Sequence, residues 1–167
     1  MTEEEFINTV IPLLEKDFFI KEEVSGIHLS GQKVRIDRVI MPKDPTDWPN
    51  GRKTAFGLEF KKPKYESFKD ISKIFKQCVD YHYTRFGENE IYLPIIICPT
   101  PFNEEDKTQY WIEKILGRFH IGFLKFIDYH DGQDLQIVFS ETHTIWSYRD
   151  GVMEGNRWKF KRKFGSQ

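Results

Sequence analysis

The chain has little of what would indicate a disulfide-stapled or zinc-binding protein. Its 167 residues include two cysteines, Cys78 and Cys98, and neither belongs to a Cys-x-x-Cys pair of the kind that binds zinc. Free cysteines are among the residues most often buried, so we expect two reduced thiols inside the protein. Because the sequence also shows no signal peptide, we expect a cytoplasmic protein.

Long apolar runs and an excess of one charge are missing as well. The longest apolar run, around residues 93–98, has the length of a strand and contains Pro94, so no membrane partner is expected. The 25 lysines and arginines nearly balance the 26 aspartates and glutamates, which leaves a net charge of −1. This balance does not indicate a nucleic-acid binder, and it does not exclude one, because local patches matter more than the sum. The five histidines show no metal-ligand spacing, and we interpret them as surface or packing residues.

What the chain does have is enough apolar sequence for one packed domain. Hydrophobic residues make up 39% of it and aromatic residues 16%, and this length suits one sizeable core better than two. We expect a single domain over residues 1–167, with a core at about 3–98 and an elaboration at about 99–167. The predicted fold class is α/β, with a mixed sheet of four to six strands flanked by helices and a C-terminal α+β extension.

Hydrophobic periodicity and turn residues locate the elements. The predicted elements of the core are a helix at 3–16, strands at 18–24, 33–41 and 54–62, a helix at 67–86 and a buried strand at 91–98. The predicted elements of the elaboration are a helix at 103–117, a hairpin of 121–129 with 135–140, and a strand at 144–148. Thr2 and Glu5 form a capping-box pattern at the first helix, and Gly87 is a C-cap candidate after the second.

The same patterns predict which side chains share a face. We read Ser25-Gly26 and Ser30-Gly31 as turn signals after the first strand, which we expect to pair antiparallel with the second. The apolar residues expected to share one face of the second strand are Val34, Ile36 and Ile40. The residues expected to point inward from the helix at 103–117 are Trp111, Ile112, Ile115 and Leu116.

The third strand carries the most informative pattern. Phe56, Leu58 and Phe60 alternate on one face, which suits a core, while Glu59 and Lys61 point to the other. A second carboxylate, Asp37, lies in the preceding strand. Two carboxylates on neighbouring strands with an ammonium group beside them make a compact anionic pocket with a cation at its rim. A Mg²⁺-dependent phosphodiesterase needs a pocket of this kind.

This arrangement resembles the PD-(D/E)XK nuclease superfamily, whose restriction-endonuclease-like core has the element order αβββαβ. The resemblance covers about residues 3–98 and maps the superfamily's aspartate to Asp37 and its Glu-x-Lys to Glu59 and Lys61. The residue before the aspartate is Ile36, where the superfamily's name has proline. Gln77 and Tyr81 fit the Gln-x-x-x-Tyr signature that some branches carry on the following helix. Beyond residue 98 the chain matches no subfamily.

The resemblance implies a role for each site residue. Asp37, Glu59 and the backbone carbonyl of Phe60 would hold Mg²⁺ or Mn²⁺. Lys61 would hold or deprotonate the attacking water, or stabilise developing charge. The residues expected to support substrate and ligands are Gln77 and Tyr81. A first-helix glutamate found in other branches would be Glu5, with Glu15 as second choice.

DNA is the expected partner, and two groups of basic and aromatic residues are candidates to bind it. Those near the proposed site are Arg35, Arg38, Lys62, Lys64 and Lys73. Those in the C-terminal basic and aromatic run are Trp158, Lys159 and Lys161. A solvated edge strand explains that run equally well. In the excursion at 42–53, Trp48 is either a wedge between bases or a loop anchor.

Taken singly, these patterns have plainer explanations. Asp37 alone suits a salt bridge with Arg35 or Arg38, and Glu59 with Lys61 alone suits a solvated strand face. Together they predict a Mg²⁺- or Mn²⁺-dependent deoxyribonuclease, which we expect to be an endonuclease without a small-molecule cofactor and which could be a homodimer. One alternative is a catalytically silent nuclease-fold module that binds nucleic acid or a protein partner. Another is an unrelated α/β protein whose strand charges are ordinary surface.

Overall fold

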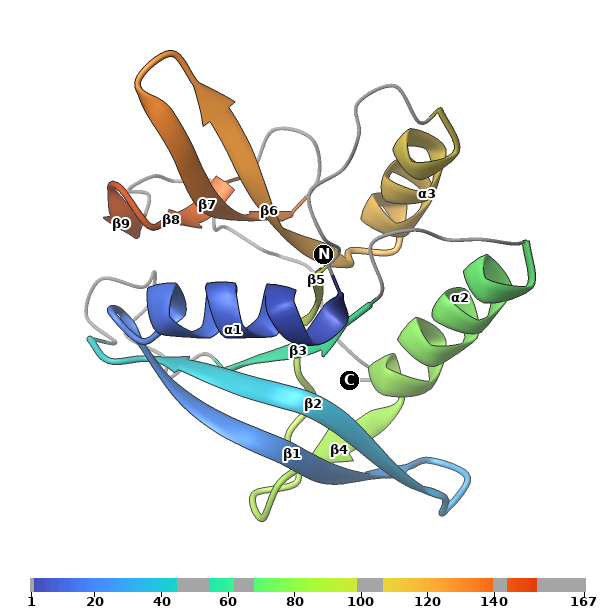
Figure 1. Cartoon of the computed structure of the whole chain (residues 1–167). Helices are drawn as coiled ribbons and strands as arrows, with labels where there is room; N and C mark the ends of the chain where they lie inside the picture. The colour runs from blue at the N-terminus through green and yellow to red at the C-terminus, as the bar shows by residue number, and fades with distance from the viewer. Residues whose placement is uncertain (1, 45–54, 62–67, 99–106, 140–143, 153–167) are drawn as a thin grey trace.

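The computed structural model describes residues 2–44, 55–61, 68–98, 107–139 and 144–152, which form a mixed α/β fold (Figure 1). Its helices are α1 (Glu3–Leu14), α2 (Phe68–His82) and α3 (Lys107–Arg118). Its strands are β1 (Phe18–His28), β2 (Lys33–Pro42), β3 (Phe56–Phe60), β4 (Thr84–Phe86), β5 (Ile95–Cys98), β6 (Gly122–Tyr129), β7 (Gly132–Phe139), β8 (Thr144–Ser147) and β9 (Gly151–Val152).

One sheet contains all nine of these strands, in the order β4-β1-β2-β3-β5-β6-β7-β8-β9. The β5 strand lies in its middle and runs parallel to both β3 and β6, while the other neighbours are antiparallel. The predicted α/β class with a mixed sheet and flanking helices is confirmed. The prediction of four to six strands was wrong, because the strands after residue 121 continue the same sheet and β4 adds a short edge.

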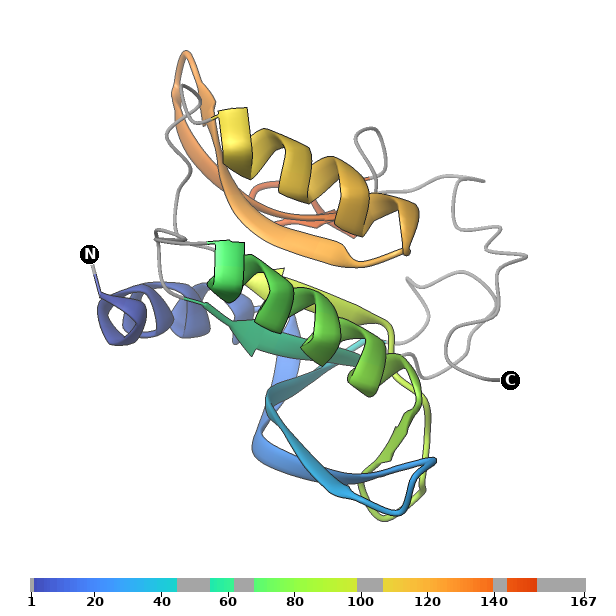
Figure 2. The ribbon, with the colours of Figure 1, turned by 90° about the vertical axis from the view of Figure 1, so that its right-hand side faces the viewer.

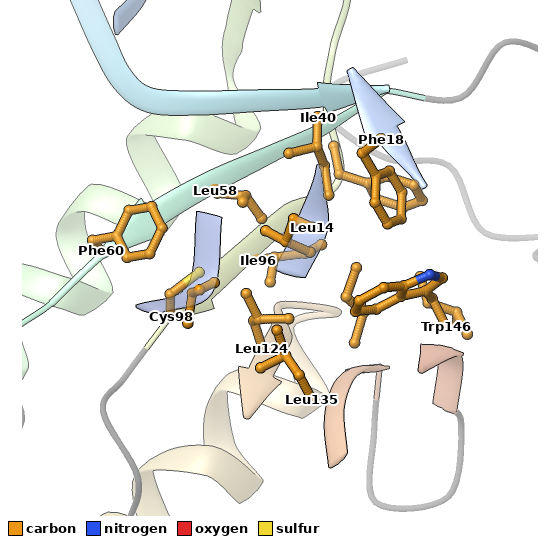
Figure 3. Close-up of a cluster of buried hydrophobic side chains, with 14 of the residues drawn as sticks. Leu14, Phe18, Ile40, Leu58, Phe60, Ile96, Cys98, Leu124, Leu135 and Trp146 are labelled. Carbon is orange, nitrogen blue, oxygen red and sulfur yellow. The ribbon is translucent and has the colours of Figure 1, made fainter. Parts of the chain in front are cut away.

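Helices cover both faces of the sheet, and each face has its own apolar core (Figure 2). The α1-side core joins the buried stripe of α1, Phe6, Val10 and Leu14, to inward residues from β2, β3 and β5 to β8 (Figure 3). The α2-side core joins α2 to the other faces of β2 and β5 and to residues around β6. Both cores draw on residues before and after position 98.

The start of the chain agrees with its sequence signals. Thr2 and Glu5 form the predicted capping box, each side chain bonding the other's backbone N–H. The α1 helix continues past Pro12 and ends at Leu14, two residues before the predicted end. The C-terminal strands dock near that end, where the Nε1 of Trp146 donates to a carboxylate oxygen of Asp17 at 2.8 Å.

The predicted end of the second helix was wrong. The α2 helix stops at His82, and Thr84–Phe86 forms β4 along the edge of β1. Gly26 makes this pairing possible, because a Cβ there would overlap the side chains of Thr84 and Phe86. Ser25-Gly26 therefore lies inside β1 and is not a turn, whereas Ser30-Gly31 lies in the turn between β1 and β2, which pair antiparallel as predicted. Gly87, the predicted C-cap, instead begins the turn after β4, and its N–H donates to the carbonyl of Ser25. Pairing with β1 outweighs the local helical pattern.

Two further predictions were wrong in detail. The strand predicted from residue 91 begins at Ile95, since Pro94 has no N–H to donate and Ile91 makes only an isolated bridge with Phe86. On α3, Leu116 is buried as predicted, but Trp111 and Ile115 are 59% and 41% exposed. The apolar stripe of this helix is wider than the strip that the sheet covers, and sequence periodicity alone does not show which edge is buried. The side chain of Ile112 lies outside the described residues.

No helix in the described ranges is long and apolar enough to cross a membrane.

Candidate metal-binding site

The site is built around β3, where all five residues are buried. The predicted alternation of this strand is confirmed, since Phe56, Leu58 and Phe60 belong to the α1-side core. The ring of Phe60 meets that of Phe6 edge to face at 6.3 Å. Glu59 therefore points to the opposite face, towards α2, and it is 5% exposed. The sheet is covered on both sides here, so Glu59 is a buried carboxylate and not part of a solvated strand face.

Asp37 lies where β2 leaves its neighbours on both sides. Towards β3, the last regular pair is Arg38 with Leu58. Towards β1, the register passes from Glu22↔Arg38 to Val24↔Ile36 without a pair at Asp37. The residue opposite Asp37 is Glu23, which has a φ of 46°, in the left-handed region that strands avoid. Asp37 therefore stands at an interruption of the sheet.

The Asp37 carboxylate replaces the missing ladder bond. The N–H groups of Gly57 and Lys61 donate to carbonyls of Pro94 and Cys98 on the β5 side, so the N–H of Phe60 faces β2. It donates to the Oδ2 of Asp37 at 2.8 Å. The carbonyl of Phe60 faces the same side, as the two groups of one strand residue do. Two predicted metal ligands, the Asp37 carboxylate and the Phe60 carbonyl, are thus on the side where β2 departs.

A glycine allows β2 to bend at this point. A Cβ on Gly57 would overlap the Cδ1 of Ile36 and stand 3.1 Å from the Cδ1 of Ile95. Ile36 fills the space over Gly57 and belongs to the α2-side core, whereas Ile40 belongs to the α1-side core. The prediction that Val34, Ile36 and Ile40 share one face was therefore wrong, because simple alternation assumes a straight strand.

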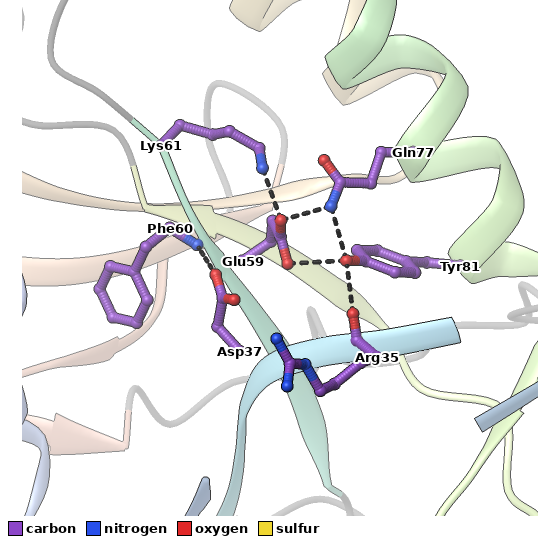
Figure 4. A network of polar contacts seen from close by, with 7 residues as sticks. All are labelled: Arg35, Asp37, Glu59, Phe60, Lys61, Gln77 and Tyr81. Carbon is purple, nitrogen blue, oxygen red and sulfur yellow. Dashed lines mark hydrogen bonds and ion pairs between the residues drawn. The ribbon is translucent and has the colours of Figure 1, made fainter. Parts of the chain in front are cut away.

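Five hydrogen bonds converge on Glu59 and Tyr81 (Figure 4). The Oε1 of Glu59 accepts from the Nζ of Lys61 and from the Nε2 of Gln77, both at 2.5 Å. Its Oε2 lies 2.8 Å from the hydroxyl of Tyr81. The Nε2 of Gln77 also donates to that hydroxyl at 2.7 Å. The two helix residues of the predicted Gln-x-x-x-Tyr pattern are thus brought onto the predicted glutamate.

Tyr81 links three elements through a single proton. Its hydroxyl lies 2.9 Å from the carbonyl of Arg35 as well as 2.8 Å from Glu59. A phenol has one proton, so it donates to one of these acceptors at a time. The contact with Arg35 is made by a main-chain group and leaves no trace in the sequence, so sequence reasoning did not find it.

Burial and neighbouring charge set the electrostatics of the site. Desolvation raises the pKa of Glu59, the ammonium of Lys61 lowers it and the negative charge of Asp37 raises it, with a net upward shift. Desolvation and the nearby carboxylate also raise the pKa of the Tyr81 phenol. The adjacent thiol of Cys78 is buried, which raises its pKa to about 12 and makes it an inert packing residue. Both cysteines are free and buried, as predicted.

The donor set suits a hard divalent cation. Among the described residues no group of three or more histidine, cysteine, aspartate or glutamate side chains gathers at one point. Mg²⁺ needs fewer, since it takes about one or two protein carboxylates and fills its other positions with water and phosphate oxygens. Asp37 and Glu59 provide that number, and their charges interact. The Lys61 ammonium occupies the Oε1 of Glu59, so a cation bound there would compete with it.

The two glutamates predicted as extra ligands lie on α1. Glu5 is at the first turn, exposed, and its carboxylate accepts the N–H of Thr2. This bond lowers the pKa of Glu5. Glu15 is the C-cap at the other end of the helix. The α1 helix packs on the face opposite Glu59.

The predicted DNA-binding residues divide into two ion-paired arginines, one exposed lysine on α2, and a group that lies outside the described residues. Arg35 is exposed and pairs with Glu23 at 3.3 Å. Arg38 is largely buried and pairs with Glu22 at 3.2 Å. Lys73 is exposed on α2. The candidate residues that lie outside the described ranges are Trp48, Lys62, Lys64, Trp158, Lys159 and Lys161. The salt-bridge partners of Arg35 and Arg38 are glutamates of β1, so the alternative that Asp37 is only their salt-bridge partner does not describe these contacts.

Comparison of the chain with models of protein families, with curated proteins and with solved structures found no significant match.

Proposed function

We propose that the protein is a metal-dependent nuclease of the PD-(D/E)XK type that hydrolyses DNA phosphodiester bonds. The observation that carries the proposal is the meeting of Asp37 and Glu59 at the point where β2 departs from β3, with the Lys61 ammonium 2.5 Å from Glu59. The order α1-β1-β2-β3-α2-β5 supports it, being the predicted αβββαβ order with one short strand, β4, inserted.

Each site residue has a role in this proposal. Asp37, Glu59 and the Phe60 carbonyl would hold Mg²⁺ or Mn²⁺, which supplies charge neutralisation for the phosphate and a more acidic water. Lys61 lies at the partly exposed edge of the site, with a side chain 20% exposed, and there it contacts the attacking water or the phosphate. Gln77 and Tyr81 fix the Glu59 carboxylate through both of its oxygens. A buried carboxylate with fixed donors keeps one orientation, which a metal ligand requires.

A silent nuclease-fold module is the second candidate. The ion pairs of Arg35 and Arg38 with β1 glutamates favour it in one respect, because they neutralise cations that would otherwise attract phosphate. The Asp37 and Glu59 pair argues against it. Two carboxylates placed so that one raises the pKa of the other are costly to the fold, and a module that binds no cation gains nothing from that cost.

The deciding experiment is incubation with plasmid, linear, single-stranded and four-way-junction DNA, each with Mg²⁺ or Mn²⁺, with Lys61→Ala as the matched variant. We expect cleavage of at least one substrate by the wild-type protein and none by the variant. Full activity in EDTA would exclude the metal mechanism. Calorimetric titration of the wild-type protein with Mn²⁺ distinguishes the nuclease from the silent module, because the module would give no heat of binding.

A further inference from the structure

We infer that Arg38 is a positioning residue that holds Asp37 in place for metal binding, and not a residue that contacts phosphate. This inference rests on the proposed function for its consequence, but its geometry is that of the protein alone. It assigns Arg38 a role that its position in a basic strand does not suggest.

The first observation is the bond that Arg38 makes. Its NH1 donates to the main-chain carbonyl of Asp37 at 2.8 Å. The regular pair of Asp37 with Glu23 is missing from the register of β1 and β2. The guanidinium therefore supplies a donor to the carbonyl of a residue at which the regular pairing with β1 is interrupted.

The second observation is that Asp37 is held by side-chain bonds at both ends. Its carbonyl accepts from Arg38 and its carboxylate accepts from the N–H of Phe60. Regular strand residues are held by the ladder, which does not depend on any one side chain. At Asp37 the ladder is interrupted on both sides, so the loss of the Arg38 contact frees the backbone that carries the carboxylate.

The third observation is the cost of placing Arg38 there. Its side chain is 17% exposed, and the NH2 pairs with Glu22 at 3.2 Å. Its Nε is one of two buried side-chain nitrogen or oxygen atoms that lack a hydrogen-bond partner within the described part of the chain. An incompletely bonded, largely buried guanidinium opposes folding. Its orientation towards Asp37 and Glu22 also leaves little of it for a DNA phosphate.

If Arg38 acts only through its charge, its removal should raise the affinity for a divalent ion. If Arg38 positions Asp37, its removal should lower that affinity, so the two roles can be told apart. Removing a cation near the site strengthens binding of a divalent ion if charge is all that matters. Removing a group that orients a ligand weakens binding, by about tenfold or more for comparable outer contacts of metal ligands. Arg35, two residues earlier in β2, provides the control, because it has the same charge, pairs with Glu23 and is 64% exposed.

The experiment measures Mn²⁺ affinity by calorimetry without DNA, in wild type, Arg38→Met and Arg35→Met. We expect Arg38→Met to weaken binding by about tenfold or more and Arg35→Met to leave it equal or stronger. Equal or stronger binding by Arg38→Met would overturn the inference while leaving the proposed function intact. Should Arg38→Met not fold, Arg38→Lys serves, since an ammonium cannot reach carbonyl and carboxylate in the same forked geometry.

A second measurement does not need the metal. NMR can measure the hydrogen-exchange rates of two backbone amides of β3. The N–H of Phe60 donates to the Asp37 carboxylate, and that of Leu58 belongs to the last regular pair with β2, Arg38↔Leu58. We expect Arg38→Met to speed exchange at Phe60 by about tenfold relative to Leu58. Equal acceleration at both would show a purely structural role and overturn the inference. If the wild-type protein binds no Mn²⁺ but Phe60 loses protection selectively, the proposed function fails and Arg38 still positions Asp37.

Discussion

Glu59 and Asp134 are both buried carboxylates on strands of the same sheet, 5% and 2% exposed, but the groups around them differ. Asp134 on β7 accepts the N–H of Arg149 on one oxygen and the Nε2 of Gln136 on the other. Gln136 is held in turn by Thr144 and Tyr129. These donors join β6, β7 and β8 to the turn before β9, and this is a structural role.

Glu59 has charged neighbours. The ammonium of Lys61 forms an ion pair with it, and the carboxylate of Asp37 is near enough to raise its pKa. A purely structural site gains nothing from two like charges brought together, as the donors of Asp134 illustrate. The comparison indicates that burial of a carboxylate does not identify a functional site by itself, and that burial next to another carboxylate makes Glu59 the better candidate of the two.

The strongest test of this difference measures both DNA cleavage and thermal stability after substitution of Glu59 and of Asp134. We expect Glu59→Gln to reduce Mg²⁺-dependent cleavage by about 1,000-fold, within the range for loss of a group that acts in the reaction, with little change in melting temperature. Asp134→Asn should cleave DNA normally once folded. Plasmid nicking and thermal unfolding measure both. Normal cleavage by Glu59→Gln would remove the distinction.

Stability should respond in the opposite order. Asp134→Ala leaves the N–H of Arg149 without its side-chain acceptor and removes one of the two acceptors of the Gln136 Nε2. Because a buried unsatisfied donor costs about 1–3 kcal/mol, we expect a loss of about 2–3 kcal/mol in the free energy of unfolding. Urea denaturation followed by circular dichroism gives this value. A loss as large in Glu59→Gln would mean that Glu59 is equally structural.

Metal affinity sharpens the role of Lys61. We expect Lys61→Met to raise Mn²⁺ affinity by about tenfold, because its ammonium no longer competes for the Oε1 of Glu59. Lys125→Met is the matched control, since Lys125 pairs with Glu113 at 3.3 Å and has a similar exposure. Calorimetry without DNA measures both. Weaker binding by Lys61→Met would show that Lys61 helps to build the site.

The smallest effect concerns pH. The pKa of Glu59 is raised above its ordinary value of 4.5 in the folded protein. At a pH between 4.5 and the raised pKa, Glu59 keeps its proton in the folded chain but loses it in the unfolded chain. The stability that this group contributes is therefore present at low pH and falls as the pH rises. We expect Glu59→Gln to lack this component of the slope in urea unfolding above pH 4.5. Glu90→Gln, an exposed control, should retain it.

Local signals predicted the parts of the fold that depend on neighbours in sequence. The capping box at Thr2 and Glu5, the alternation of Phe56, Leu58 and Phe60, and the four-residue step from Gln77 to Tyr81 are all short-range patterns. Each fixes a face or an end of one element. They were enough to bring together the predicted glutamate, lysine, glutamine and tyrosine.

Features that depend on another part of the chain escaped prediction. The end of α2 depends on β1, to which Thr84–Phe86 pairs, and local propensity does not report this. The outward direction of Trp111 depends on how much of α3 the sheet covers. The bend at Asp37, with the Arg38 bond to its carbonyl, arises from interrupted pairing with two strands at once. No periodicity in β2 encodes it.

The missing side chain of Gly57 has a consequence for how this protein tolerates change. Ile36 is fully buried over that glycine, so a methyl group there has to displace the Cδ1 of Ile36, the residue before Asp37. Gly57→Ala would keep every polar atom of the site, and we expect the repacking of Ile36 to change the spacing between its two acids. It would separate having the right groups from having them at the right distance, a distinction that no substitution of the acids themselves can make.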